Sequence, residues 1–379
     1  MEKGKWKRTL LGEAIEDRHE LIQTAFALGL AELHPLRHAL LDVRLDDREA
    51  DAIEGRLGCG ELLENLDAET RLLHHPSDSA DLAFDPVQAS DDGLLLGCIQ
   101  HDVVYAAHEL RVSPGYDGRG VRIYDQGSGP PLIVIPGVQG RREWFAPTFA
   151  ALSSRCRTIS FTLAGDLGSG RKLDPELGFE NYLRQLDEVF ERTGLARAAV
   201  CGISFGGLIA VRYAALRPER VSALVIASSP GPGWKPDPRQ AGYIAHPWRK
   251  AVTFIATSPG RIWSEVTAAC GPVGGLSFLA RHGARALAAP MTPGLMAGRI
   301  LETQAIDFSL DCVAIQAPTL VISGEPHLDR IVPVESTRKY AEMIRGAKYV
   351  MLKGTGHLGM VTRPGEWTEI VSRFVSQHP

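Results

Sequence analysis

Continuous apolar runs alternate with amphipathic stretches from about residue 116 onward in this 379-residue chain. The runs at 131–136 (PLIVIP) and 221–229 (VSALVIASS) are typical of strands buried on both faces of a sheet. The stretch 179–194 (FENYLRQLDEVFERTG) has the spacing of an amphipathic helix and ends at Gly194, a C-cap residue type. This alternation predicts parallel βαβ units and an α/β fold with a doubly wound, mostly parallel sheet.

The alternation breaks after Pro230 and resumes at "PTLVISGE" (318–325). Residues 231–306 between them are rich in Gly, Pro, Ala and Trp, with short helical patches. An insertion at the carboxyl edge of such a sheet often covers the ligand crevice. The pattern therefore predicts a catalytic core at 104–230 and 307–379, interrupted by a helical cap at 231–306. The aromatic residues of this segment indicate either an apolar acyl pocket or the cap's own core: Trp234, Trp248, Phe254, Trp263 and Phe278.

Residues 1–103 show helical patterns and then an acidic loop. Residues 1–110 carry 10 Lys and Arg against 23 Asp and Glu, a net charge of −13, whereas residues 111–379 carry +9. We expect an N-terminal helical accessory region that packs against the catalytic domain or mediates a homodimer. The pair His74-His75 beside acidic residues is either a metal site or, as is more usual, part of a solvated polar loop. We expect no metal and no cofactor.

Composition restricts the partners and the compartment. The net charge of −4 argues against a nucleic-acid binder. We also expect no membrane partner, because no uncharged stretch is long enough to span a bilayer and no signal-peptide core follows the basic N-terminus. The expected partner is a small-molecule substrate. No CxxC pair occurs among the six cysteines, which predicts free thiols and a cytoplasmic location: Cys59, Cys98, Cys156, Cys201, Cys270 and Cys312.

The chemistry is indicated first by Gly202-Ile203-Ser204-Phe205-Gly206, which joins an apolar strand directly to an apolar helix. A Gly-x-Ser-x-Gly motif alone is a weak signal, but a strand-to-helix elbow is the position where a serine nucleophile is held. The free N–H groups at the start of the helix point toward such a serine. Ser204 is therefore either a nucleophile or part of a structural turn.

A serine nucleophile needs a histidine base that is oriented by an acid, in the chain order Ser, acid, His. His357 lies in "LKGTGHLGM" (352–360), a Gly-rich turn after the last predicted strand and at the same sheet edge as Ser204. The other downstream histidines are His246, His282, His327 and His378, of which the first two belong to the insertion and the last lies near the chain end.

The acid should follow the preceding strand, where the loop "GEPHLDRIVP" (324–333) offers two carboxylates. We favour Asp329, four residues before Pro333, and keep Glu325 as the alternative.

An oxyanion hole needs two backbone donors. Phe205 N–H follows the nucleophile, and the loop "GVQG" (137–140) offers Val138 N–H. Arg141 and Arg142 follow this loop, and they either meet an acidic substrate group or form a solvated loop face.

From about residue 104 to 379 the chain resembles the α/β-hydrolase family, close to its esterase, lactonase and carbon–carbon hydrolase branch. The matching stretches are "DGRGVRIYDQGSGPPLIVIPG", "CGISFGG", "RYAALRPERVSALVIASS", "PTLVISGEPHLDRIVP" and "GTGHLG". The resemblance implies that Ser204, Asp329 and His357 form the triad and that 231–306 is the cap domain. It leaves about the first 100 residues unexplained.

Two departures from the family pattern are present. Pro136-Gly137 stands where the family usually has His-Gly, and the acid loop is two residues longer than usual, which keeps Glu325 open. The leading hypothesis is a serine hydrolase of an ester, lactone, thioester or related carbonyl compound. The alternatives are an acyltransferase, a cofactor-free haloperoxidase with the same triad, or a ligand-binding receptor on a hydrolase scaffold.

Overall fold

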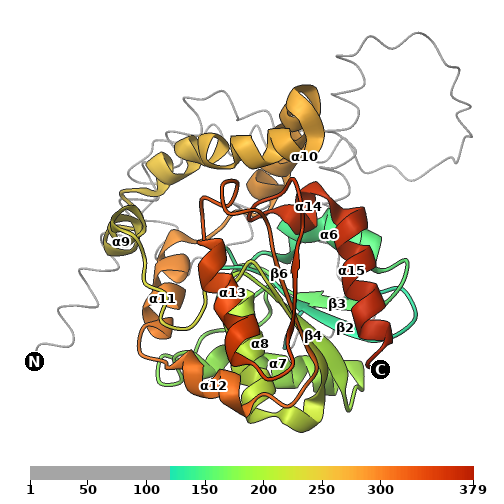
Figure 1. Ribbon diagram of the computed structural model, residues 1–379. Helices are drawn as coiled ribbons and strands as arrows, with labels where there is room; N and C mark the ends of the chain where they lie inside the picture. The colour runs from blue at the N-terminus through green and yellow to red at the C-terminus, as the bar shows by residue number, and fades with distance from the viewer. Residues whose placement is uncertain (1–119) are drawn as a thin grey trace, which may run out of the picture. The chain divides into compact units, whose positions relative to one another are not determined.

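Seven strands form one sheet in the computed structural model, which describes residues 120–379 (Figure 1). Their order across the sheet is β1-β3-β2-β4-β5-β6-β7. β1 runs antiparallel to β3, and the other pairs are parallel, so the predicted doubly wound, mostly parallel sheet is confirmed. The strands are β1 (Ile123–Gln126), β2 (Pro131–Ile135), β3 (Arg157–Phe161), β4 (Ala198–Ile203), β5 (Val221–Ala227), β6 (Thr319–Ser323) and β7 (Lys348–Met351).

The central strands are buried on both faces. In β2, Ile133 and Ile135 belong to one hydrophobic cluster, whereas Leu132 and Val134 belong to another. Successive side chains of a strand point to opposite faces, so a continuous apolar run supplies both layers of core. This is why these strands have no polar alternation in the sequence.

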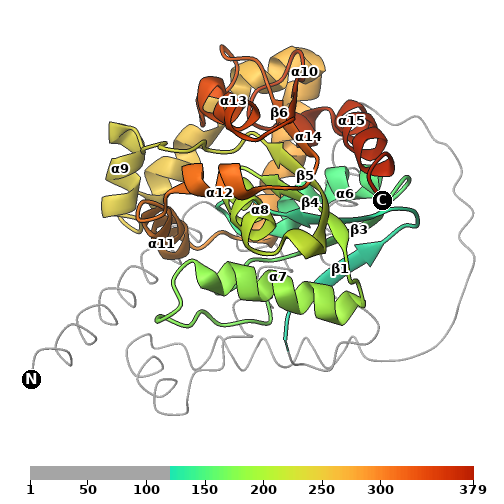
Figure 2. The same cartoon turned by 60° about the horizontal axis from the view of Figure 1, so that its bottom comes forward.

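Helices cover both faces (Figure 2). The first cluster contains side chains of α7 (Glu180–Thr193), α8 (Phe205–Leu216), α12 (Phe308–Ala314) and α13 (Val334–Met343). The second contains side chains of α6 (Ala146–Leu152) and α15 (Pro364–Ser376). Gly194 ends α7 with φ 69°, as its predicted C-cap role requires. Three short elements complete the core: η2 (Arg142–Phe145), η3 (Pro218–Arg220) and α14 (Gly359–Thr362).

Residues 231–306, hereafter the inserted segment, contain α9 (Pro238–Ala245), α10 (Ala251–Ala288) and α11 (Pro293–Thr303). The short helical patches expected in this segment include the two halves of α10. The halves are separated by a kink at Gly271, whose φ of 72° and ψ of 170° are not helical. Pro272 follows the kink and cannot donate a backbone hydrogen bond to the preceding turn.

The inserted segment is hydrogen-bonded to loops that follow three different strands. Gln240 Nε2 donates to Ile331 O after β6 at 2.9 Å, and Trp144 Nε1, after β2, donates to Ala289 O at 2.9 Å. After β7, Leu358 N donates to Glu265 Oε1 at 2.6 Å. The carboxyl ends of parallel strands share one sheet edge, so the inserted segment is attached to that edge, where α10 lies beside α14 in Figure 1.

Two predictions fall outside the described residues: the accessory region 1–103 and the His74-His75 pair. Within residues 120–379, no helix combines the length and apolar composition needed to cross a bilayer. The four cysteines in this range are free thiols: Cys156, Cys201, Cys270 and Cys312.

Candidate functional site

Ser204 occupies a sharp turn between β4 and α8. Its φ of 52° and ψ of −120° lie outside the usual regions for a residue with a side chain, and such strain is concentrated at functional positions. A Cβ on Gly202 would lie 2.2 Å from Gly206 O, and one on Gly206 would lie 2.4 Å from Ile135 O. Both glycines of the motif are therefore required, because a side chain at either position would collide with neighbouring backbone. Ser204 itself is half-buried at the edge of the sheet.

The predicted acid and base lie in contact. His357 Nδ1 is 3.2 Å from Asp329 Oδ2, and both residues are buried. The other carboxylate oxygen, Asp329 Oδ1, accepts hydrogen bonds of 2.9 Å from Ile331 N and Val332 N. The backbone of the loop thus fixes the carboxylate, which in turn orients the imidazole.

Glu325 has a different contact. Its Oε1 accepts a hydrogen bond of 2.9 Å from Gly354 N, and its Oε2 lies 3.5 Å from His327 Nδ1. The acid loop therefore brings Asp329, rather than Glu325, to His357. Within residues 120–379 the Ser204 hydroxyl makes no hydrogen bond to His357; in unliganded sites this bond is often long and shortens when substrate binds.

His357 is surrounded by two carboxylates. Burial alone would lower the pKa of His357, but the charge and hydrogen bond of Asp329, together with the charge of Glu265, raise the pKa above its usual value. Glu265 belongs to α10 and is 1% exposed. Burial raises the pKa of Glu265 to about 7, although hydrogen bonds from Gly356 and Leu358 and the nearby His357 oppose the shift.

The loop after β2 lies directly beside the serine. Gly140 N donates to Gly137 O at 2.9 Å and closes a turn over 137–140. A Cβ on Gly137 would be 3.5 Å from Ser204 Cβ. Gly137 O points into the turn, where it accepts this hydrogen bond. In a trans peptide the N–H points opposite to the C=O, so Val138 N–H points out of the turn. Within the described chain, neither Val138 N–H nor Phe205 N–H donates to another group.

Arg141 and Arg142 do not form a solvated face. Arg141 is 2% exposed, donates to Leu167 O and lies 3.4 Å from Glu143 Oε2. Arg142 is partly buried, with Glu143 at 4.0 Å and the ring of Tyr124 beneath its guanidinium. The contacts of Arg141 are therefore structural, and a buried group is poorly placed to meet a substrate.

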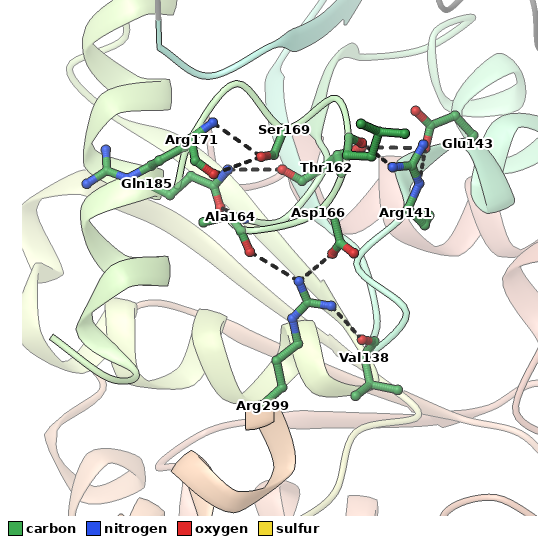
Figure 3. A network of polar contacts seen from close by, with 11 residues as sticks. Val138, Arg141, Glu143, Thr162, Ala164, Asp166, Ser169, Arg171, Gln185 and Arg299 are labelled. Atoms are coloured by element: carbon green, nitrogen blue, oxygen red, sulfur yellow. Dashed lines mark hydrogen bonds and ion pairs between the residues drawn. The ribbon is translucent and has the colours of Figure 1, made fainter. Parts of the chain in front are cut away.

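A buried ion pair, unsuspected from the sequence, joins the inserted segment to the loops after β2 and β3. In Figure 3, Arg299 of α11 points toward Asp166, Ala164 and Val138. Its Nη1 donates to Val138 O at 2.9 Å, and its Nη2 donates to Ala164 O at 3.2 Å and to Asp166 Oδ2. Both side chains of the ion pair are 0% exposed.

Two of the remaining downstream histidines pack against aromatic rings. His282 is stacked on Phe278 and meets Trp144 edge to face. Burial, with a smaller contribution from Arg285, lowers the pKa of His282 to about 4. His378 packs against Phe374 near the chain end.

The aromatic residues of the inserted segment differ in their surroundings: Phe278 belongs to the second hydrophobic cluster of the sheet, and Trp263 is exposed. Phe254 meets Tyr243 edge to face and lies under the guanidinium of Arg261. The contacts of Phe254 favour the second of the two predictions, a core belonging to the insertion itself, whereas Phe278 packs in the core of the sheet. Within residues 120–379 no group of three or more His, Cys, Asp or Glu side chains is arranged to hold a metal ion.

Sequence comparison places the chain among known proteins. A family model described as alpha/beta hydrolase fold matches residues 130–364. The "Putative carbamate hydrolase RutD" of Pseudomonas savastanoi pv. phaseolicola is 27% identical over 244 residues, which cover 62% of this chain and 89% of that protein. The poly(3-hydroxyalkanoate) depolymerase of Ectopseudomonas oleovorans is 26% identical over 258 residues, which cover 65% and 84%.

Solved structures show the same fold. The enol-lactonase from Burkholderia xenovorans is similar with a TM-score of 0.55 and 22% identity, over 68% of this chain and 96% of that one. An esterase from Exiguobacterium antarcticum is similar with a TM-score of 0.55 and 19% identity, over 67% and 95%. At these identities the likeness establishes the fold alone.

Proposed function

This chain belongs to the alpha/beta hydrolase fold family, which supports hydrolase activity, and we propose that it is a serine hydrolase with Ser204, Asp329 and His357 as its catalytic triad. The observation that carries the proposal is the 3.2 Å contact between His357 and Asp329 at the sheet edge where the elbow holds Ser204. A strained serine and an oriented histidine are the two components that nucleophilic acyl transfer requires.

In the proposed reaction, Ser204 Oγ attacks the substrate carbonyl carbon and transfers its proton to His357 Nε2. A bond forms between Oγ and that carbon, and the carbonyl electron pair moves to oxygen. Val138 N–H and Phe205 N–H donate to the resulting oxyanion. The intermediate then collapses, and the leaving group departs with the proton held by His357.

Water completes the cycle. His357, neutral again, takes a proton from the water molecule that attacks the acyl carbon. The second tetrahedral intermediate then collapses: the bond between the acyl carbon and Ser204 Oγ breaks, Oγ takes the proton from His357, and the acid is released. Asp329 keeps the imidazole in the tautomer with Nδ1 protonated and stabilises its charged form. We propose that the inserted segment is the cap of this site, because its hydrogen bonds reach the loops after β2, β6 and β7.

The proposed substrates are esters, lactones, thioesters and related carbonyl compounds. The names of the relatives, which include a putative carbamate hydrolase and a poly(3-hydroxyalkanoate) depolymerase, add carbamates and hydroxyalkanoate esters to this set. A panel of these classes, with p-nitrophenyl esters of increasing acyl length, is the appropriate screen.

The proposal is tested by labelling with a fluorophosphonate and locating the label by mass spectrometry. We expect it on Ser204, with loss of labelling in Ser204→Ala. Ser228 is the matched control, because it also follows a strand and also has a positive φ, of 45°; Ser228→Ala should still label. A wild-type protein that neither labels at Ser204 nor hydrolyses any panel member would refute the proposal.

A further inference from the structure

Arg299 is the most completely buried cation of the inserted segment among the described residues, at 1% exposure. It lies near the middle of α11, and its guanidinium reaches two loops of the core (Figure 3). The partners are Val138 O on the loop after β2, and Ala164 O and Asp166 Oδ2 on the loop after β3. One side chain therefore holds two loops and a helix together.

The loop geometry is built around this ion pair. Gly140 has φ 75°, and a Cβ there would lie 2.0 Å from Asp166 Oδ2 and 2.5 Å from Arg299 Nη1. A glycine is thus needed both for the backbone conformation and for the space that the guanidinium and carboxylate occupy. Gly140 O in turn accepts a 2.8 Å hydrogen bond from Leu163 N, which joins the same two loops through their backbone.

We infer that Arg299 is a positioning residue for the oxyanion hole, acting through the carbonyl of Val138. The inference rests on the proposed function, in which Val138 N–H is a donor to the oxyanion. The amide and carbonyl of Val138 belong to adjacent peptide planes of a four-residue turn. Holding the carbonyl at 2.9 Å from a buried guanidinium therefore restricts the orientation of the amide.

The expected effect is on the chemical step rather than on substrate binding. The oxyanion forms only when the carbonyl carbon becomes tetrahedral, so a misdirected donor lowers kcat with little change in KM. Loss of one oxyanion donor costs roughly 10²–10³ in kcat. A donor that is present but loosely held should lower kcat by less, roughly 10–100-fold.

Two variants separate positioning from folding. Arg299→Lys keeps a positive charge beside Asp166, but an ammonium on a shorter reach cannot reproduce the planar fork that contacts three oxygens. Arg299→Gln combined with Asp166→Asn removes both charges together, so no unpaired buried ion remains. The matched control is Arg217→Lys, which alters a bidentate arginine–carboxylate pair with Asp187 between α7 and α8.

The measurements are kcat, KM, the pH dependence of kcat/KM and the inhibition constant of a trifluoromethyl ketone that matches the best ester. The ketone adds to Ser204 Oγ and carries its negative charge on the former carbonyl oxygen, so it reports on the oxyanion hole. For both Arg299 variants we expect kcat to fall 10–100-fold and ketone binding to weaken similarly. KM should change less than threefold, and the acid limb of the pH profile should not move. Arg217→Lys should leave kcat, KM, the pH profile and the inhibition constant of the ketone unchanged.

The inference is overturned if folded Arg299→Lys keeps more than half of kcat and of ketone affinity. It is also overturned if KM and the pH profile shift as much as kcat, or if neither Arg299 variant folds, because the ion pair would then be only structural. Failure of the proposed function is separate, since it would appear in the wild type as absent Ser204 labelling and absent turnover.

Discussion

Glu265 accepts a 2.6 Å hydrogen bond from the backbone N–H of Leu358, the residue that follows His357. Glu265 lies on α10 of the inserted segment and is buried. A carboxylate from the insertion therefore holds the loop that carries the proposed catalytic base, and its ionisation affects both stability and the histidine.

The first prediction concerns stability and pH in Glu265→Gln. The pKa of Glu265 is raised to about 7 by burial, so the folded protein holds this proton more tightly than the unfolded chain. The resulting stabilisation is present below pH 4.5 and is lost as pH rises toward 7. Glutamine stays neutral, so the free energy of unfolding of the variant relative to wild type should increase by up to about 3 kcal/mol from pH 4.5 to pH 8.

Denaturant unfolding at several pH values measures this difference. The control is Glu335→Gln, at an exposed carboxylate of α13. Its free energy of unfolding should differ from that of wild type by the same amount at every pH. A difference in free energy of unfolding between Glu265→Gln and wild type that stays constant from pH 4.5 to pH 8 would contradict the prediction. Because Glu265 also raises the pKa of His357, the acid limb of kcat/KM should move to lower pH in the variant.

Ser204→Ala should lower kcat by roughly 10⁴–10⁶, since the nucleophile is removed. Stability should change by less than about 0.5 kcal/mol, because the half-buried hydroxyl makes no hydrogen bond in the described part of the chain. Steady-state kinetics and thermal unfolding test both statements. Retention of a tenth of wild-type activity would exclude Ser204 as the nucleophile.

Asp329→Asn and Glu325→Gln distinguish the two acid candidates. Asp329→Asn should lower kcat by roughly 10³–10⁴, because an amide facing Nδ1 favours the wrong tautomer. It should also move the acid limb to lower pH, since Asp329 raises the pKa of His357. Glu325→Gln retains an acceptor for Gly354 N–H and should stay within threefold of wild type. The opposite ranking of the two variants would identify Glu325 as the acid.

Gly206→Ala should destabilise the fold by about 1–3 kcal/mol or more, because the new Cβ would lie 2.4 Å from Ile135 O and 2.6 Å from Pro136 O. Both neighbours are backbone atoms of β2 and its loop, so they cannot move aside cheaply. Gly260→Ala is the control, since nothing lies within 4 Å of its Cβ position in α10. It should be neutral or slightly stabilising. Equal midpoints of denaturation for the two variants would show that the elbow is not crowded.

A chain that begins near residue 104 should fold and keep measurable esterase activity. The reason is that residues 120–379 contain the sheet, the inserted segment and every candidate catalytic and oxyanion-hole residue. Circular dichroism, light scattering and ester hydrolysis would test this, and a change in oligomeric state would link residues 1–103 to dimerisation. A well-folded but inactive product would assign those residues to the active site.

The elements of the sheet and the neighbourhood of the site could be predicted because their signals are local. A buried strand needs a continuous apolar run, and the elbow at Ser204 needs glycines at fixed offsets. The Asp329–His357 contact could be anticipated because each residue follows a strand, and strand ends meet at one edge.

The charged residues of the interior could not be predicted in this way. Arg299 and Asp166 are 133 positions apart, and neither lies in a distinctive motif. Glu265 lies on a helix whose burial depends on what packs against it. The sequence predicts that Arg141 either meets an acidic substrate group or lies on a solvated loop face, because it shows the charge of Arg141 but not its contacts with Glu143 and Leu167.

Two charged residues of the inserted segment, Glu265 and Arg299, are buried against the core. Their contacts restrict how this segment can be replaced. If the inserted segment caps the site as proposed, exchanging it for one from a relative would alter substrate preference while keeping the core. Here the graft would also remove the partners of Leu358 N–H and of Asp166. Under the proposed function, a change of insertion would therefore affect substrate preference and catalysis together, and we expect an active chimera to need residues equivalent to Glu265 and Arg299.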